Sequence, residues 1–190
     1  DYIDNKSGVS ARMTITAYEN LISTAERRAL KQGLEITTVR LSDFMGIIPA
    51  ITGKVELVYE GEQVGATNVA LDLISDAIRE FFPAYFPKIE KLERDTDASP
   101  YAKILEWFFA ESGFELLDDA SDEEYKMQLD AVEPLDNLVQ KFQPNFPKAD
   151  LYFLKEFILW GLVEFDKLSK DRVAVGYQFK DLYASYINKL

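Results

Sequence analysis

The sequence lacks two of the side chains that most often perform catalysis. The chain of 190 residues contains no histidine and no cysteine. Imidazole bases, thiol nucleophiles, disulfides and the usual zinc ligands are therefore excluded. Carboxylate, lysine, tyrosine or hydroxyl chemistry remains. Acidic pairs such as Asp118-Asp119 and Glu123-Glu124 are present, but spacing alone does not identify a glycosidase-type pair among them.

Gly53-Lys54 has the form of the last part of a phosphate-binding loop. That motif needs a glycine five residues before Gly53 and a serine or threonine after the lysine, because the loop cradles phosphates with backbone N–H groups and the hydroxyl binds magnesium. Ile48 and Val55 occupy those two positions. The motif therefore fails at both ends, and we interpret Gly53-Lys54 as an ordinary turn.

The run from Asp118 to Glu124 resembles a cation-binding loop in composition. A calcium loop needs glycine where Glu123 stands and an oxygen ligand where Ala120 stands. We therefore interpret the run as a solvated acidic loop that caps a helix, and we expect no metal site in this chain. Two aromatic stripes, Trp107 to Phe109 and Phe157 to Phe165, are interpreted as core rather than as a ligand pocket.

Arg12 is the remaining candidate, and a long helix must position it. The sequence predicts a helix from Ser10 to Gln32, with Ser10 as the N-cap and Gly33 at the C′ position. A cation in the first turn opposes the helix dipole at a cost of about 0.3–1 kcal/mol. Such local conflicts concentrate at functional positions, although a plain surface arginine is the simpler alternative. The expected inward face is Ile15, Tyr18, Leu21, Ile22, Ala25 and Ala29.

The rest of the pattern predicts an all-α fold, a helical bundle with one small β-hairpin between residues 34 and 60. The two hairpin strands are expected at 35–41 and 54–60, where β-branched and alternating residues concentrate. Glycines at 61 and 65 indicate a boundary, which gives domains 1–62 and 63–190. Further helices are expected at 66–82 with Phe81 inward, at 99–113, from the Ser121 capping box to a break at Pro134, at 149–169 in the centre of the bundle, and at 177–187.

Composition limits the partners. The chain has 33 acidic and 21 basic residues, for a net charge of -12. Such a charge repels phosphate backbones, so we expect no nucleic-acid partner. The most apolar run, Leu151 to Val163, is shorter than the roughly 20 residues that span a bilayer, so we expect no membrane partner. The absence of cysteine fits a cytoplasmic location.

One stretch resembles a known family. Residues 8–30, from Gly8-Val9-Ser10-Ala11-Arg12 onward, resemble the sensor-2 region of AAA+ ATPases of the magnesium-chelatase I-subunit and MoxR group. In that group a small-Ser-x-Arg motif opens a lid helix, and a Val-x-x-x-Asp element, here Val39 to Asp43, starts the next one. The resemblance covers about residues 7–60, while residues 61–190 resemble a C-terminal helical extension of a bacterial magnesium-chelatase-like or sigma-54-interacting subgroup.

The resemblance implies that Arg12 is the sensor-2 arginine, which reaches the γ-phosphate of ATP bound to a core domain. The phosphate-binding loop and the strand ending in Asp-Glu that holds magnesium are absent from this sequence. We therefore expect a chain with no activity, cofactor or metal of its own, and a parent ATPase that binds ATP and Mg²⁺ and extends upstream of Asp1. The implied partners are that core, neighbouring ATPase subunits and an unidentified protein substrate, with partner remodelling or metal insertion as the outcome.

A second hypothesis from another class stays open. The net charge of -12 and the apolar helix at 149–169 also fit a stand-alone acidic helical module that binds a basic partner protein. An upstream reading frame that encodes a phosphate-loop core would favour the ATPase hypothesis. A carboxylate hydrolase is a distant third, because no constellation of residues supports it.

Overall fold

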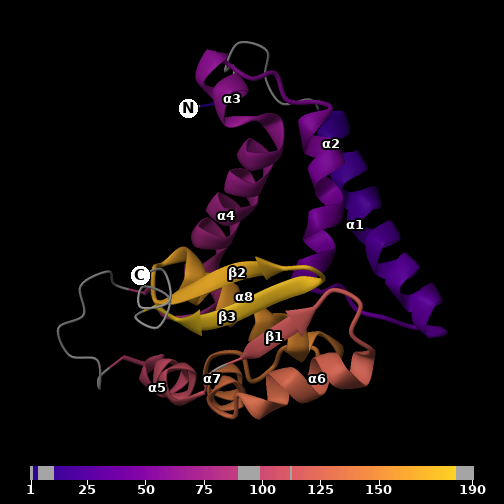
Figure 1. The fold of residues 1–190 in the computed structure, drawn as a ribbon. Coiled ribbons are helices and arrows are strands. Elements are labelled where there is room, and N and C mark those ends of the chain that lie inside the picture. Colours follow the sequence, from indigo (N-terminus) through magenta and orange to yellow (C-terminus); the bar gives the residue numbers. More distant parts are fainter. Residues whose placement is uncertain (1, 4–10, 90–98, 112, 183–190) are drawn as a thin grey trace. The chain divides into compact units, whose positions relative to one another are not determined.

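The computed structural model describes residues 2–3, 11–89, 99–111 and 113–182. This part of the chain is mostly helical with one small antiparallel sheet (Figure 1), which confirms the expected fold class. The chain forms two compact units, residues 1–77 and 78–190, and the division falls inside helix α4 (Ala66–Tyr85). The sequence-based boundary at 62/63 lies within helix α3 (Tyr59–Val64) and stays a prediction. No helix in the described ranges is long and apolar enough to cross a membrane.

Unit 1 is organised around one long helix. Helix α1 (Ala11–Gln32) packs on the 3-10 helix η1 (Leu41–Ile47) and on helix α2 (Ile48–Thr52). A Cβ atom at Gly46 would lie 2.0 Å from Oγ1 of Thr24, so only glycine allows η1 to approach α1 this closely. Helix α3 and the first part of α4 complete the unit.

The β-hairpin predicted between residues 34 and 60 is wrong in its location. Residues 35–40 form no strand, and Leu57 makes a single isolated bridge to Ile3 before α3 begins. The β-branched run lies instead beside α1, where Ile36 and Val39 help to line a groove although Ile36 is 86% exposed. Pro49 lies at the start of α2, where its missing N–H costs no hydrogen bond.

Unit 2 contains the sheet, whose strand order is β1-β3-β2 with both pairings antiparallel. The hairpin β2–β3 turns at residues 174–175, and Gly176, whose φ of 138° suits glycine, begins β3. The elements of unit 2 after α4 are α5 (Ala102–Ala110), β1 (Phe114–Leu117), α6 (Asp122–Ala131), α7 (Pro134–Phe142), η3 (Lys148–Asp150), α8 (Leu151–Glu164), β2 (Leu168–Val173) and β3 (Gly176–Asp181).

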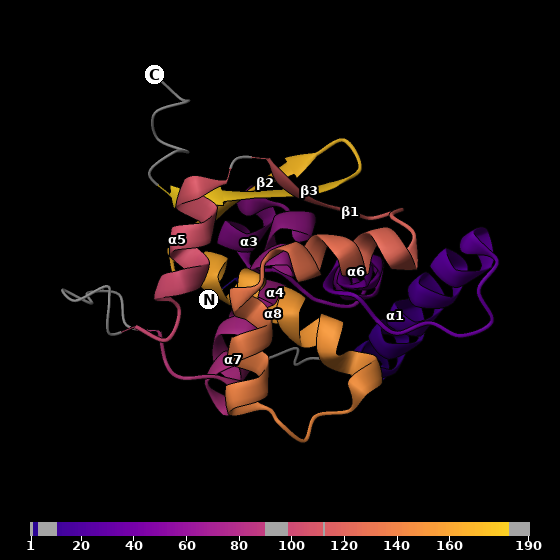
Figure 2. The same cartoon turned by 90° about the horizontal axis from the view of Figure 1, so that it is seen from below.

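One face of the sheet is covered by helices, as Figure 2 shows for α5, α6 and α8. Opposed residues of an antiparallel pair share a face, so the register Phe114↔Phe179↔Lys170 places all three on this covered face. Phe114 meets Phe108 of α5, and Tyr177 meets Trp160 of α8. The residues of β3 on this face are therefore buried. The strand corrects the helix expected at 177–187, of which residues 183–187 lie outside the described ranges.

The core of unit 2 surrounds Phe82, which is fully buried and contacts four aromatic rings, those of Phe86, Tyr101, Phe157 and Phe165. The expected inward residue, Phe81, is instead 60% exposed. Helix α8 is buried along most of its length, as its apolar composition predicts. It ends at Glu164 rather than near residue 169, because the chain then enters β2.

Candidate functional site

Arg12 lies where the sequence predicted, in the first turn of α1, and its side chain is exposed. The hydroxyl of Thr16 donates to the carbonyl oxygen of Arg12 at 2.8 Å, one turn along the helix. Ser10, the expected N-cap, lies outside the described residues. The structure therefore places the Arg12 side chain at an accessible helix end, as a contact to a ligand held elsewhere would require.

The C-terminal end of α1 is fixed by a tight turn. Gly33 has φ of 68°, the N–H of Leu34 donates to the carbonyl of Ala29 at 2.9 Å, and the N–H of Gly33 donates to that of Leu30 at 3.2 Å. These bonds form a Schellman motif, which confirms the role expected for Gly33. The turn sends residues 34–39 back beside α1.

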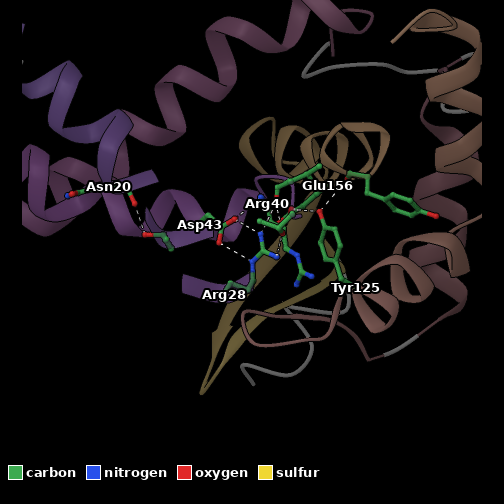
Figure 3. Close-up of polar contacts among 10 residues, drawn as sticks. Asn20, Arg28, Arg40, Asp43, Tyr125 and Glu156 are labelled. Atoms are coloured by element: carbon green, nitrogen blue, oxygen red, sulfur yellow. Dashed lines mark hydrogen bonds and ion pairs between the residues drawn. The ribbon is translucent and has the colours of Figure 1, made fainter. Parts of the chain in front are cut away.

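A buried ion pair then fastens α1 to η1 (Figure 3). Nη2 of Arg28 lies 2.8 Å from Oδ2 of Asp43, and Nε lies 3.2 Å from Oδ1, which makes the pair bidentate. Both side chains are buried. The guanidinium also donates to Oγ1 of Thr37 at 3.0 Å and to the carbonyl of Thr38 at 2.7 Å, and the N–H of Arg40 donates to Asp43 at 2.8 Å.

This network has the connectivity that a buried charge pair needs to be tolerated, because both charges are satisfied by further hydrogen bonds. It ties the helix to the element that follows it across 15 residues of chain. The sequence suggested that Asp43 starts the next helix, and the structure does place it in the first turn of η1. Sequence reasoning missed its partner, Arg28.

A groove of about 500 Å³ opens between α1 and the returning segment. Its walls are largely apolar, with Ile22, Ala25 and Ala29 on the α1 side and Leu34, Ile36 and Val39 opposite. The two charged residues in its lining, Glu26 and Glu35, are both acidic. Ile15 and Tyr18 were expected to be buried, but they are 60% and 65% exposed. The site therefore continues along α1.

The other sequence candidates have structural roles. Gly53 ends α2 with an ordinary helical φ of -85°. In the acidic run, Asp118 pairs with Arg172 at 2.7 Å, and Ser121 forms the expected capping box with Glu124. The hydrogen bond from the Ser121 side chain is the main reason that the pKa of Glu124 is lowered. The described residues contain no cluster of three or more carboxylates that could hold a metal ion.

The aromatic stripe at Trp107 to Phe109 is core only in part. Phe108 is buried, but Phe109 is 77% exposed. A second concavity, of about 250 Å³, lies between α5 and α7 and carries Lys103, Lys141 and Asn137 beside Pro100, Pro134 and Leu138. Exposed lysines bind small anions weakly, and this pocket has about half the volume of the groove of unit 1.

Unit 2 also buries two charges of α8 that interrupt its apolar run. Lys155 contacts Asp130 at 2.5 Å and Asp136 at 2.8 Å, and its Nζ lies 4.7 Å from the centre of the Tyr152 ring. Its neighbour Glu156 accepts a hydrogen bond of 2.7 Å from the hydroxyl of Tyr125 (Figure 3). Burial, followed by the hydrogen bond to Asp130, raises the pKa of Tyr152 to about 12.

Lys170 packs against aromatic rings on the covered face of the sheet. Its Nζ lies 3.3 Å from the centre of the Trp160 ring and 4.0 Å from Oε1 of Glu164. Burial lowers the pKa of Lys170 from 10.5 to about 8, although Glu164 opposes this shift. Glu164 is also paired with Arg79 at 3.1 Å. These bonds link α4, α8 and β2 and explain the group as part of the packing of unit 2.

Comparison of the chain with models of protein families, with curated proteins and with solved structures gives no match. The interpretation of the site therefore rests on the residues and their geometry.

Proposed function

We propose that residues 1–62 form the lid of an AAA+ ATPase of the magnesium-chelatase I-subunit and MoxR group, and that residues 63–190 are its C-terminal helical domain. In this proposal, Arg12 contacts the γ-phosphate of ATP held by a core domain outside these 190 residues. The chain has no ATPase activity of its own. It couples hydrolysis in the core to the remodelling of a partner or to metal insertion.

The position of Arg12 at the exposed start of α1 carries the proposal. A guanidinium is always charged and can bind two phosphate oxygens at once. A contact to the γ-phosphate exists with ATP and is lost with ADP, so its free energy differs between the two states, as a switch requires. The Arg28–Asp43 pair supports the second half of the mechanism, because it joins α1 to η1 through two hydrogen bonds between buried side chains.

The proposal is tested in the product of the complete reading frame. If that frame encodes a phosphate-binding loop upstream, Arg12→Ala is expected to lower the ATPase rate by more than about tenfold, or about 1.4 kcal/mol of transition-state stabilisation. The matched control is Arg27→Ala, which removes an exposed arginine of the same helix. An unchanged rate for Arg12→Ala, with unchanged circular dichroism, would remove the sensor role.

A titration of the 190-residue chain with ATP gives an independent test. We expect weak or undetectable binding, because the phosphate loop and the magnesium ligands are absent from this sequence. Tight, magnesium-dependent binding would contradict the proposal.

The second candidate is an acidic helical module that binds a basic partner protein. The groove of unit 1, with its acidic lining residues, favours it. An upstream reading frame without a phosphate-binding loop would favour this candidate over the ATPase lid.

A further inference from the structure

Helix α1 carries an apolar stripe that is longer than the groove. Ile15, Tyr18, Ile22, Ala25 and Ala29 follow one another at steps of three or four residues, which places them on one face of the helix. The stripe runs from Ile15 to Ala29, which is about 21 Å at a rise of about 1.5 Å per residue. Its C-terminal part lines the groove and its N-terminal part is exposed.

Large apolar side chains border this surface on the outside as well. Leu30 is 79% exposed and Ile36 is 86% exposed, and both line the groove. With Ile15 and Tyr18 they make four large, exposed apolar residues on one continuous surface of unit 1. Single exposed apolar residues are ordinary, but a contiguous rimmed patch marks an interaction site.

The charged residues around the stripe differ in sign between the two sides of the helix. Glu26 and Glu35 lie in the groove lining, and Glu19 lies seven residues before Glu26, on the same flank of α1. The cations Arg27 and Lys31 fall on the opposite side of the helix, because each residue turns the side chain by about 100°. Arg12 lies seven residues before Glu19 on the same flank, so the flank of the stripe is negative only beyond the first turn of α1.

We propose that this surface binds an amphipathic helix of another protein, about four turns long, with an apolar face and lysine or arginine along its edge. A helix laid in a groove reads anchors at the spacing that the stripe itself shows. The acidic flank selects a basic partner through charge complementarity. The proposal does not depend on the ATPase function, because it needs neither nucleotide nor Arg12.

The test uses fluorescence anisotropy with three labelled model peptides of about 15 residues. The first has leucine at helical spacing and lysine at the flanking positions. The second replaces the lysines by glutamate, and the third keeps the lysines but replaces the leucines by serine. We expect the first peptide to bind at least about tenfold more tightly than either of the others in low salt, and the advantage over the second to shrink in high salt.

Variants of the chain then locate the binding. Leu30→Ser and Ile36→Ser change exposed side chains, so they should leave the fold intact and weaken the first peptide by about tenfold or more. The triple change Glu19→Lys, Glu26→Lys and Glu35→Lys should invert the preference toward the glutamate peptide. Matched controls in unit 2 are Met127→Ser, which is 61% exposed, and Glu80→Lys, which is also exposed; both should leave binding unchanged.

Three results would overturn the proposal. Equal binding of the lysine and glutamate peptides would remove the charge selection. Normal binding by Leu30→Ser and Ile36→Ser would place the contact elsewhere. Concentration-dependent self-association that Ile36→Ser abolishes, seen by sedimentation velocity, would show that a second copy of this chain is the occupant. ATP titrations and ATPase rates are separate readouts, so failure here leaves the proposed lid function untouched.

Discussion

Removing the carboxylate of Asp43 is expected to destabilise unit 1 severely. In Asp43→Ala, the Arg28 guanidinium loses two hydrogen bonds of 3.2 and 2.8 Å, and the N–H of Arg40 loses one of 2.8 Å. Arg28 keeps its contacts to Thr37 and Thr38, but its charge stays buried without a counter-charge from Asp43. Breaking one partner of a buried ion pair costs about 3–5 kcal/mol.

That loss is a large fraction of the total stability of a small domain, which is about 5–15 kcal/mol. With a urea dependence of about 1.5 kcal/mol per molar, the unfolding midpoint should fall by about 2–3 M. Both tryptophans, Trp107 and Trp160, belong to unit 2. Far-UV circular dichroism therefore follows both units, whereas tryptophan fluorescence reports on unit 2. If the units unfold separately, the dichroism should show an early transition that the fluorescence lacks.

The sharper test is the double variant. Arg28→Met together with Asp43→Ala removes the orphaned charge, so it should be more stable than Asp43→Ala alone. Additive destabilisation in this double-mutant cycle, or a cost below about 1 kcal/mol for Asp43→Ala, would refute the claim that the pair fastens α1 to η1.

Three further outcomes follow from unit 2. Gly161→Ala should destabilise the protein by about 1–2 kcal/mol in urea unfolding, because the new Cβ would lie 2.2 Å from the buried Phe82 ring. Helix propensity alone favours alanine by about 1 kcal/mol. A stabilised variant would therefore contradict this packing. Lys155→Met should leave the free energy of unfolding nearly unchanged. Asp130→Ala combined with Asp136→Ala should lower it by about 3 kcal/mol or more, since the buried ammonium then lacks these two carboxylates. An unfolding midpoint lower for Lys155→Met than for the double variant would contradict this expectation. The lowered pKa of Lys170 means that the unfolded chain binds more protons than the folded one between pH 8 and 10.5, so stability should rise with pH in that window. Lys170→Met should abolish the rise, and a profile unchanged by that substitution would contradict it. Measurements should stop near pH 10, because the raised pKa of Tyr152 makes stability fall at higher pH.

Local signals predicted the helices well. Gly33 marks the end of α1, Pro134 separates α6 from α7, and the Ser121 capping box opens α6. Each of these depends on backbone geometry within four or five residues, which the sequence displays directly. The exposed position of Arg12 followed from the start of α1 in the same way.

The strands were missed because their pairing is non-local. On β2, Lys170 and Arg172 lie opposite Phe179 and Tyr177 on the same face of the sheet, where Lys170 is partly buried and Arg172 is exposed. Long cationic side chains can pack their aliphatic stems against aromatic rings. The sequence of β2 therefore lacks the alternation of apolar and polar residues that predicts a strand. Lys54 to Glu60 shows a cleaner alternation, but most of this segment has no neighbouring strand to pair with. A strand pattern therefore predicts a strand only when a partner edge is available.

The helical periodicity of α1 alone could have predicted that Arg28 of the unit 1 ion pair is buried. Arg28 lies beside Ala25 and Ala29 on the buried face of α1, and all three are buried. A cation on an apolar face requires a counter-charge, and Asp43 in the next element supplies it. The partner could not be assigned from the sequence, because other carboxylates lie at comparable separations.

The same ion pair bears on both proposals for α1. Arg12 can report on a nucleotide only if a displacement at the start of the helix is transmitted to its far end, and a helix fixed to η1 by a bidentate pair transmits it as a rigid body. The apolar stripe needs the same rigidity, since a groove that is already formed costs little ordering free energy when a helix binds. The pair is buried in the C-terminal half of α1, whereas Arg12, Ile15 and Tyr18 lie exposed in the N-terminal half. The buried pair thus holds α1 in place while Arg12, Ile15 and Tyr18 stay exposed. Both proposals require this arrangement, one at the end of the helix and the other along its side.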